Sequence, residues 1–413
     1  MSSAEGTLTE PTVLAHAKRA LFPENDERPG YAVVDTQFAR REWLDGKLVD
    51  EWVREQLSPF NHVRIGSGYP DLVGVRTLDD AFLAVERFGE EPPLVAIEAK
   101  GHTGGGVDTE RGIVQAYDRL GEANAAYLAA PVDVITGTDR TLARELNVGI
   151  LGVRTDGAVN PIEVPRVVGN RTTTEANALR FQASAQGVAN KSFSLNHPKN
   201  YFGYVLAHYA DGQTAAIHEE YVVGAVDGSR IGAAFLGLIR DGPGGVELTS
   251  LGKEVVRFAV DRYGSVDAAL EEFVGWQRSR RRFIEIEPAW GNLARRILFA
   301  YPATELLVEE LQGLYDLGVP QPTLAELVEY LHPLHPTFTV ELFIRGDDGV
   351  RSQVLATDGE LQTDTLRSGA VYHAPTVFQL KTMLYHAGIL TENGTEPSNL
   401  DPTADSWALR EPV

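Results

Sequence analysis

Two short apolar runs with charged ends constrain this chain more than any other feature of its sequence. Residues 72–75 follow Asp71 directly, and residues 94–97 lead directly into Glu98 and Lys100. Apolar runs of this length that contain valines predict strands. Because side chains two residues apart share one face of a strand, Glu98 and Lys100 are expected to point the same way. The sequence therefore predicts two adjacent strands that bring two carboxylates and a lysine to one place.

This combination of side chains is suited to a metal-dependent hydrolase. Two carboxylates offer the hard oxygen ligands that Mg²⁺ prefers, with Mn²⁺ as a substitute. A bound metal polarises a phosphoryl oxygen and lowers the pKa of its water, and a neighbouring ammonium stabilises developing negative charge. The alternative is purely structural: Asp71 caps a turn, and Glu98 pairs with Lys100 at an exposed strand end.

The pattern Pro70-Asp71 … Glu98-Ala99-Lys100 resembles that of the PD-(D/E)xK nuclease superfamily, which includes restriction endonucleases and archaeal Holliday junction resolvases. This resemblance implies an α/β restriction endonuclease-like core, in which helices flank a mixed central sheet. It also implies that Asp71, Glu98 and the backbone carbonyl of Ala99 bind the metal. In the same way, it implies that Lys100 positions or activates the attacking water.

Two further residues match roles that members of the family often fill. The first helix often contributes a glutamate to the metal site, and Glu51 is the best match. The helix after the lysine often carries a glutamine, and Gln115 occupies that place. Relatives commonly have a tyrosine four residues after the glutamine, whereas here Tyr117 follows after two. Without the resemblance, Glu51 is equally explained as a solvated side chain and Gln115 as an ordinary hydrogen-bonding one.

The resemblance covers about residues 37–164, and the nuclease-like domain is expected at residues 31–165. Residues 1–30 are expected to be irregular apart from one short helix. An edge strand is expected in the excursion between the two motif strands. The expected elements are helices at 13–21, 37–57, 109–124 and 138–146, and strands at 62–65, 71–76, 81–86, 94–99, 125–130 and 149–153.

Helical periodicity dominates the rest of the chain, after a polar linker at 166–199 that is expected to contain one helix. Residues 247–256 resemble the wing-to-helix segment of winged-helix domains, which predicts a winged-helix-like domain at 200–290. A second helical or winged-helix-like domain is expected at 291–413. The expected elements are helices at 204–209, 217–222, 231–239, 324–330 and 377–386, and strands at 340–344 and 407–409.

Four arginines fall within five consecutive positions late in the first of these domains: Arg278, Arg280, Arg281 and Arg282. In so acidic a chain they are candidates for contacts with the phosphates of a nucleic acid. The alternative is a helix face whose arginines pair with nearby glutamates such as Glu285.

The chain of 413 residues carries a formal net charge of −21, and seven of its 37 basic residues are lysines. Abundant carboxylates with few lysines are typical of a halophile, because a salt-rich cytoplasm screens self-repulsion. This charge disfavours DNA binding through bulk electrostatics, so contact with DNA needs a local surface. The lack of cysteine excludes disulfides and thiolate metal sites. With no long apolar segment, a cytoplasmic protein without membrane association is expected.

Together these features predict a Mg²⁺-dependent DNA endonuclease that hydrolyses phosphodiester bonds in restriction, anti-phage defence or DNA repair. A homodimer is expected from the resemblance, because cutting both strands of a duplex needs two active sites. One alternative is a DNA-binding regulator whose nuclease fold has lost catalysis. Another is a nuclease that acts on RNA or on branched DNA, because the metal chemistry does not depend on the sugar or on the strand architecture.

Overall fold

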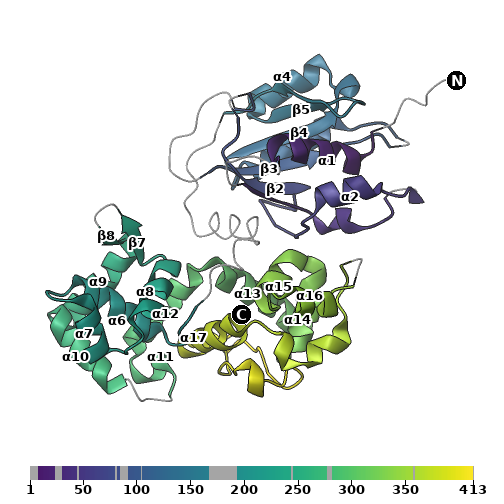
Figure 1. Cartoon of the computed structure of the whole chain (residues 1–413). Coiled ribbons are helices and arrows are strands. Elements are labelled where there is room, and N and C mark those ends of the chain that lie inside the picture. Colours follow the sequence, from purple (N-terminus) through teal and green to yellow (C-terminus); the bar gives the residue numbers. More distant parts are fainter. Residues whose placement is uncertain are drawn as a thin grey trace. The chain divides into compact units, whose positions relative to one another are not determined.

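The computed structural model describes residues 8–23, 30–43, 46–79, 81–83, 92–103, 105–166, 193–242, 245–276, 281–356 and 359–412. The chain divides into two compact units. The first unit comprises the residues up to 186 together with residues 332–338, and the second comprises residues 187–331 and 339–413. A sheet lies at the centre of the first unit, and the second is built mainly from helices (Figure 1).

The described strands of the first unit form one six-stranded mixed sheet, in which they lie in chain order. β3, β4 and β5 run parallel, and the other neighbouring pairs are antiparallel. The strands are β1 (Tyr31–Val34), β2 (Leu72–Val75), β3 (Leu94–Ala99), β4 (Ala125–Pro131), β5 (Gly149–Val153) and β6 (Val159–Glu163).

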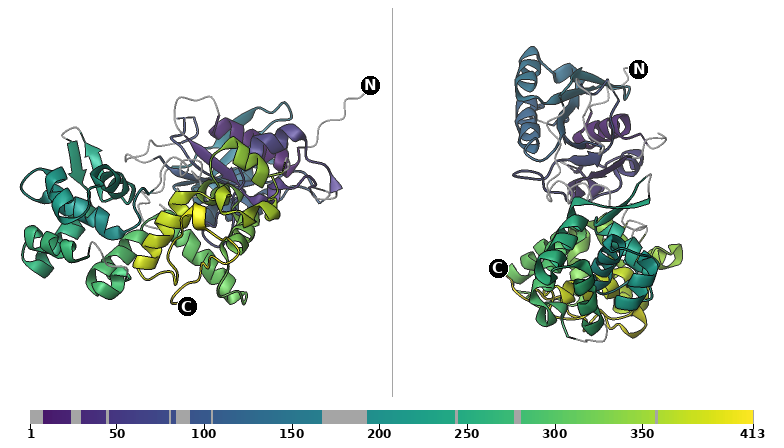
Figure 2. Two further views of the ribbon diagram at one scale, coloured as in Figure 1. Left: turned by 60° about the horizontal axis from the view of Figure 1, so that its bottom comes forward. Right: turned by 90° about the vertical axis from the view of Figure 1, so that its left-hand side faces the viewer.

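Helices cover both faces of this sheet. α1 and α2 pack on one face, and α3 and α4 pack on the other, as the purple and blue helices of Figure 2 show. The side chains of β3 alternate between the two layers, with Ile97 on the α1 side and Ala96 on the α3 side. The helices are α1 (Glu10–Leu21), α2 (Glu51–Leu57), α3 (Thr109–Arg119) and α4 (Gly137–Leu146).

The parallel half of the sheet lies where the sequence predicts it. β2 to β5 and α4 coincide closely with expected elements, whereas α3 ends earlier than expected, at Arg119. α4 begins with a reciprocal capping box between Thr136 and Asp139 and ends at Asn147, which takes the left-handed conformation. The prediction of a mixed sheet flanked by helices is thereby confirmed.

The helix expected at residues 37–57 is wrong over most of its length. A 3₁₀ helix, η1 (Thr36–Ala39), is followed by residues 40–43 and 47–50, which are not helical, and α2 begins only at Glu51. Gly46 takes a φ of 68°, a left-handed conformation that a right-handed helix cannot contain. The apolar residues of this segment therefore reach the core from two short helices instead of one long one.

The edges of the sheet also differ from the expectation. β1 and β6 form strands that the sequence analysis does not predict. β6 contains Pro161, and proline suits an edge strand because it cannot donate to a ladder. Residues 62–65, expected as a strand, are not one: Gly66 has a φ of 62° and turns the chain, so that Ile65 forms an isolated bridge with Gly68.

The helix expected at residues 13–21 is present as α1. α1 starts three residues earlier than expected, and Val13 and Leu14 are fully buried in the core beneath the sheet. This helix is therefore part of the first unit. Of the edge strand expected at 81–86, residues 81–83 begin with a turn, and the others lie outside the described residues.

The first half of the second unit follows the predicted strand-to-helix passage at 247–256. The hairpin β7–β8 precedes α9, and Thr249 caps this helix by accepting a hydrogen bond from the Gly252 amide at 3.1 Å. The helix expected at 231–239 ends at Phe235, before Gly237 with its φ of 68°. The elements are α6 (Pro198–Tyr209), α7 (Thr214–Tyr221), α8 (Val226–Phe235), β7 (Ile239–Gly242), β8 (Gly245–Leu248), α9 (Ser250–Tyr263), α10 (Val266–Trp276), α11 (Phe283–Ile286) and α12 (Pro288–Phe299).

The last part of the chain departs further from the expectation. Residues 340–344, expected as a strand, lie mostly in helix α15. Residues 407–409 form no strand, and Leu409 contributes an isolated bridge to Leu390. The linker at 166–199 lies largely outside the described residues. The elements are α13 (Pro302–Asp316), α14 (Leu324–Leu334), α15 (Pro336–Phe343), α16 (Asp348–Val354), the π-helix η7 (Pro375–Leu380) and α17 (Lys381–His386), with short 3₁₀ helices η5 (Thr363–Arg367), η6 (Gly369–Val371) and η8 (Pro397–Asn399).

Candidate active site

Asp71 and Glu98 lie side by side on neighbouring strands. In the antiparallel pair β2–β3, Leu72 lies opposite Ile97, and one further step along this register places Asp71 opposite Glu98. Both are buried, with 4% and 2% of their surfaces exposed. Asp71 Oδ2 accepts a hydrogen bond from the backbone amide of Ala99 at 2.7 Å. The strand pair thus fixes two carboxylates at one place.

Side chains from two other elements hold these carboxylates. Gln37, in η1, donates from Nε2 to Asp71 Oδ1 at 3.1 Å. Arg119, at the end of α3, donates from Nε to Glu98 Oε1 at 2.8 Å. The same arginine donates from Nη1 to Asp118 and to a backbone carbonyl, and it is 5% exposed. Each carboxylate therefore has a positioned donor from outside its own strand pair.

Lys100 follows β3 directly and lies against α3. A Cβ added at Gly112 of α3 would stand 3.0 Å from Lys100 Cγ, so the lysine stem passes close to the helix backbone. The ammonium lowers the pKa of both Asp71 and Glu98, which shows that its charge acts on both. The structure therefore brings together Asp71, Glu98 and Lys100, the three residues of the sequence motif.

Burial is the main influence on the ionisation of the two carboxyls. It raises the pKa of Asp71 well above its usual range, and the charge of Glu98 raises it further. Burial also raises the pKa of Glu98, against the lowering effect of Arg119 and then of Lys100. Two carboxylates at close range in a buried position repel each other, so this place favours an added positive charge.

A third carboxyl, Glu10 in the first turn of α1, reaches the same electrostatic environment. A Cβ at Gly101, the residue after Lys100, would collide with the backbone of Glu10, so the start of α1 packs directly on this loop. Burial raises the pKa of Glu10, Lys100 lowers it and Glu98 raises it. Glu10 therefore stands within the range of the charges of the motif, on the first helix of the domain.

Glu51, the sequence-predicted glutamate of the first helix, lies elsewhere. It is exposed in the first turn of α2 and is not among the charges that dominate the pKa of Asp71 or Glu98. The sequence favours Glu51 because residues 1–30 are polar and contain prolines, which places the first helix of the domain after residue 30. Glu10 is instead identified by its place at the start of α1, a helix whose apolar side chains pack into the core.

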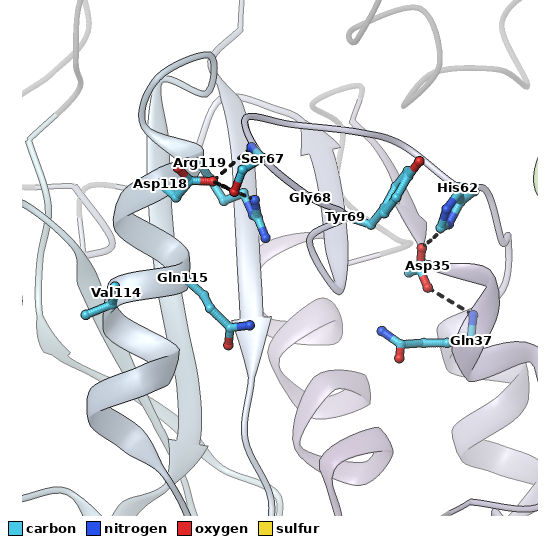
Figure 3. Close-up of a pocket in the computed structure, with 10 residues that line it drawn as sticks. All are labelled: Asp35, Gln37, His62, Ser67, Gly68, Tyr69, Val114, Gln115, Asp118 and Arg119. Atoms are coloured by element: carbon cyan, nitrogen blue, oxygen red, sulfur yellow. Dashed lines mark hydrogen bonds and ion pairs between the residues drawn. The ribbon is translucent and has the colours of Figure 1, made fainter.

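Gln115 lines a polar cavity of about 700 Å³ next to the carboxylate pair. The cavity, here called the side cavity, lies within the first unit, and Gln115 projects into it from α3 (Figure 3). Gln115 Oε1 is buried and has no hydrogen-bond partner. The residues that line the side cavity are Asp35, Gln37, His62, Ser67, Gly68, Tyr69, Val114, Gln115, Asp118 and Arg119.

Several of these residues escape sequence reasoning, Gln37 and Arg119 above all. Arg119 stands four residues after Gln115, the place where relatives of the nuclease family commonly carry a tyrosine. Residues four apart share a helix face, so this spacing is a signal that Arg119 faces the site. No comparable signal marks Gln37, because the 3₁₀ helix that positions it is itself not predicted.

The residues present fit a divalent cation with hard oxygen ligands. Asp71 and Glu98 provide the carboxylates, and Arg119 engages Glu98 through Oε1. The Ala99 amide points to Asp71, and its carbonyl points to the same side, because the N–H and C=O of one strand residue face the same neighbour. Among the described residues, no group of three or more His, Asp or Glu side chains forms a complete cage. Mg²⁺ does not need one, since it typically binds one or two carboxylates, waters and substrate phosphates.

The arginine cluster falls partly outside the described residues, which include Arg281 and Arg282 but not Arg278 or Arg280. Arg282 is not a free phosphate ligand. Its guanidinium donates to the Thr391 carbonyl at 2.6 Å, pairs with Glu285 at 3.1 Å and lies over the ring of Tyr385. This residue fixes the packing of the second unit, which is the alternative that the sequence leaves open.

Arg281 is exposed, and its Nη2 lies 3.5 Å from the Glu285 carbonyl. Of the two described members of the cluster, Arg281 is the more exposed.

Within the described ranges, no helix combines the length and apolar character needed to cross a membrane. Comparisons with protein-family models, with curated proteins and with solved structures found no match to this chain.

Proposed function

We propose that the first unit is a Mg²⁺-dependent DNA endonuclease of the PD-(D/E)xK type. The observation that supports this most directly is the side-by-side position of Asp71 and Glu98 on β2 and β3, with Lys100 following on the same strand. Burying two like charges is costly unless something compensates them. A divalent cation is the compensation that this donor set suits best.

In this proposal, Asp71, Glu98 and the carbonyl of Ala99 hold Mg²⁺ or Mn²⁺. The cation supplies Lewis acidity toward a phosphoryl oxygen and an activated water. Lys100 positions that water or stabilises the charge that develops on the phosphoryl group. The hydrogen bond from the Ala99 amide orients the Asp71 carboxylate, and Arg119 orients Glu98. Such fixed donors keep the reacting geometry in place.

The second unit is proposed to provide recognition of DNA. This proposal is supported by the hairpin β7–β8, which follows α6, α7 and α8 and leads into α9. In its hairpin, Arg240 pairs with Glu247 at 3.1 Å, and Arg230 of α8 pairs with Asp241 at 2.9 Å. DNA phosphates would compete with these exposed carboxylates. A homodimer is proposed as the unit that cuts both strands, in restriction, defence or repair.

The test is cleavage of plasmid DNA, single-stranded DNA, branched DNA and RNA at high KCl, with Mg²⁺ or Mn²⁺. Wild type is compared with Asp71→Asn and Lys100→Met, and circular dichroism checks that each variant folds. Cutting by wild type that both variants lose supports the proposal. If wild type cuts none of these substrates but binds DNA, the regulator without catalysis is the better explanation. Light scattering at the assay concentration tests the dimer.

A further inference from the structure

We propose that the side cavity receives an unpaired base of the DNA strand that is cut, so that the preferred substrate contains unpaired nucleotides instead of an intact duplex. This inference rests on the proposed nuclease function, since it names the substrate of the same site. Four features of the cavity carry it: its position, its aromatic wall, its amide groups and its charge.

The side cavity shares two residues with the shell of the carboxylate pair. Gln37 lines the cavity and donates to Asp71, and Arg119 lines it and donates to Glu98. A nucleotide whose base occupies the cavity therefore has its sugar and phosphate next to these carboxylates. The cavity of about 700 Å³ lies in the range of pockets that hold small organic ligands.

An aromatic pair forms one wall. The ring of Tyr69 stacks on that of His62 with centroids 3.5 Å apart and planes 21° apart. His62 Nδ1 is held by Asp35 Oδ2 at 2.6 Å, and Asp35 is buried. Tyr69 nevertheless keeps 44% of its surface exposed. A tyrosine that is fixed from one side and open elsewhere is a platform on which a base stacks.

Two amide side chains line the cavity. Gln115, from α3, and Gln37, from η1, point toward each other across it (Figure 3). The buried Oε1 of Gln115 has no hydrogen-bond partner, which is costly for a carbonyl oxygen away from water. The exocyclic amino group of a base is a donor that satisfies it, and glutamine side chains pair with base edges in this way.

The charge of the lining disfavours a phosphate in this place. Among the residues that line the side cavity, Arg119 is the one arginine or lysine, and it is already bound to Glu98 and Asp118. Asp35 and Asp118 add negative charge. The base is therefore the part of the nucleotide that this cavity accepts. In an intact duplex the bases are stacked and paired, and extruding one is unfavourable.

The test measures binding separately from cutting. Fluorescence anisotropy at high KCl with Ca²⁺ in place of Mg²⁺ compares a single-stranded oligonucleotide, a duplex with an unpaired flap and the blunt duplex. Wild type is expected to bind the first two about tenfold or more tightly than the blunt duplex. Tyr69→Ala is expected to weaken binding of the unpaired substrates about tenfold or more, because it removes a stacked base.

Tyr117→Ala is the matched control, because Tyr117 is 50% exposed on α3 but does not line the cavity. It is expected to change binding little. Tyr69→Phe keeps the ring and is expected to bind like wild type, which separates stacking from misfolding. Equal affinity of wild type for flap and blunt duplex, or equal losses in Tyr69→Ala and Tyr117→Ala, overturns the inference even if the protein cuts DNA. Binding that depends on Tyr69 without cleavage under Mg²⁺ or Mn²⁺ supports it and overturns the nuclease.

Discussion

The two units place buried carboxyl groups in different surroundings. In the first unit, Asp71 and Glu98 are neighbours on β2 and β3, and Glu98 pairs with Arg119 at 2.8 Å. In the second unit, Lys381 is fully buried, pairs with Asp405 at 2.8 Å and lies over the ring of Trp407. An opposite-charge pair enclosed by aromatic packing is complete in itself. In the first unit a second carboxyl group, that of Asp71, lies beside the Glu98–Arg119 pair, and this difference supports the proposal that the first unit binds a cation.

Buried histidines extend the comparison. In the second unit, the rings of His197 and His386 lie 4.1 Å apart, and the Nδ1 of each accepts a backbone amide hydrogen bond. Burial lowers the pKa of both, to about 4 for His386, and the neighbouring Lys199 lowers both further. These groups are held neutral and fully engaged in packing contacts, so they indicate a structural role.

The largest expected effect is on the like-charge pair. Asp71→Asn is expected to lower cleavage by on the order of 10³-fold, since it removes a metal ligand. The same change is expected to raise the free energy of unfolding of the first unit, because the charged form of Asp71 is disfavoured by burial and by Glu98. Steady-state cleavage and hydrogen exchange of β2 and β3 measure the two effects. Loss of both activity and stability would mean that Asp71 is a structural residue.

Removing the cation of the opposite-charge pair is expected to lower the stability of the second unit. Lys381→Met leaves Asp405 buried without its cation, and this is expected to cost the second unit about 3–5 kcal/mol. Hydrogen exchange of α17 reports on this unit alone. Lys253→Met, at an exposed lysine of α9, is the control and is expected to change little. If Lys381→Met left the free energy of unfolding of the second unit unchanged, the contrast between the buried charges of the two units would not hold.

The sequence predicts the motif well, because strand periodicity is a local property. β3 coincides with its expected range, and Asp71, Glu98 and Lys100 converge because they end neighbouring strands. Strand periodicity does not identify three residues of the side cavity: Gln37, Tyr69 and His62. Their positions depend on connecting segments whose conformation is set by the tertiary fold. Arg282 shows the reverse case: it belongs to a cluster that is basic in the sequence, but it donates to the Thr391 carbonyl, far along the chain.

The edges of the first unit illustrate a second limit. β6 carries Pro161, which argues against a strand in any sequence reading but is tolerated at the edge that it occupies. The sequence places α1 outside the domain because residues 1–30 begin with a polar stretch. Burial of Val13 and Leu14 against the sheet is a long-range effect that no local pattern reports.

The third expected effect is a pH dependence of the second unit. His386 has an ordinary pKa of 6.5 when unfolded and about 4 when folded, so between these values the unfolded state binds more protons. Stability is therefore complete above pH 6.5 and falls as the pH is lowered, by about 3 kcal/mol at pH 4. Hydrogen exchange of α6 and α17, corrected for intrinsic rates, measures this. His386→Gln is expected to reduce the dependence, and an unchanged profile in that variant would assign it to other groups.

The smallest expected effect decides between two glutamates. Glu10→Gln is expected to lower cleavage about tenfold, as for residues that support metal ligands without being indispensable. Its charge lies near Lys100 and Glu98, and the Gly101 loop holds its helix in place. Glu51→Gln is the matched variant, and because Glu51 is exposed on α2 it is expected to leave cleavage unchanged. The apparent affinity for Mn²⁺ should weaken in the first variant alone. The reverse outcome would restore Glu51 as the glutamate of the first helix, and it would mean that α2 approaches the site during catalysis.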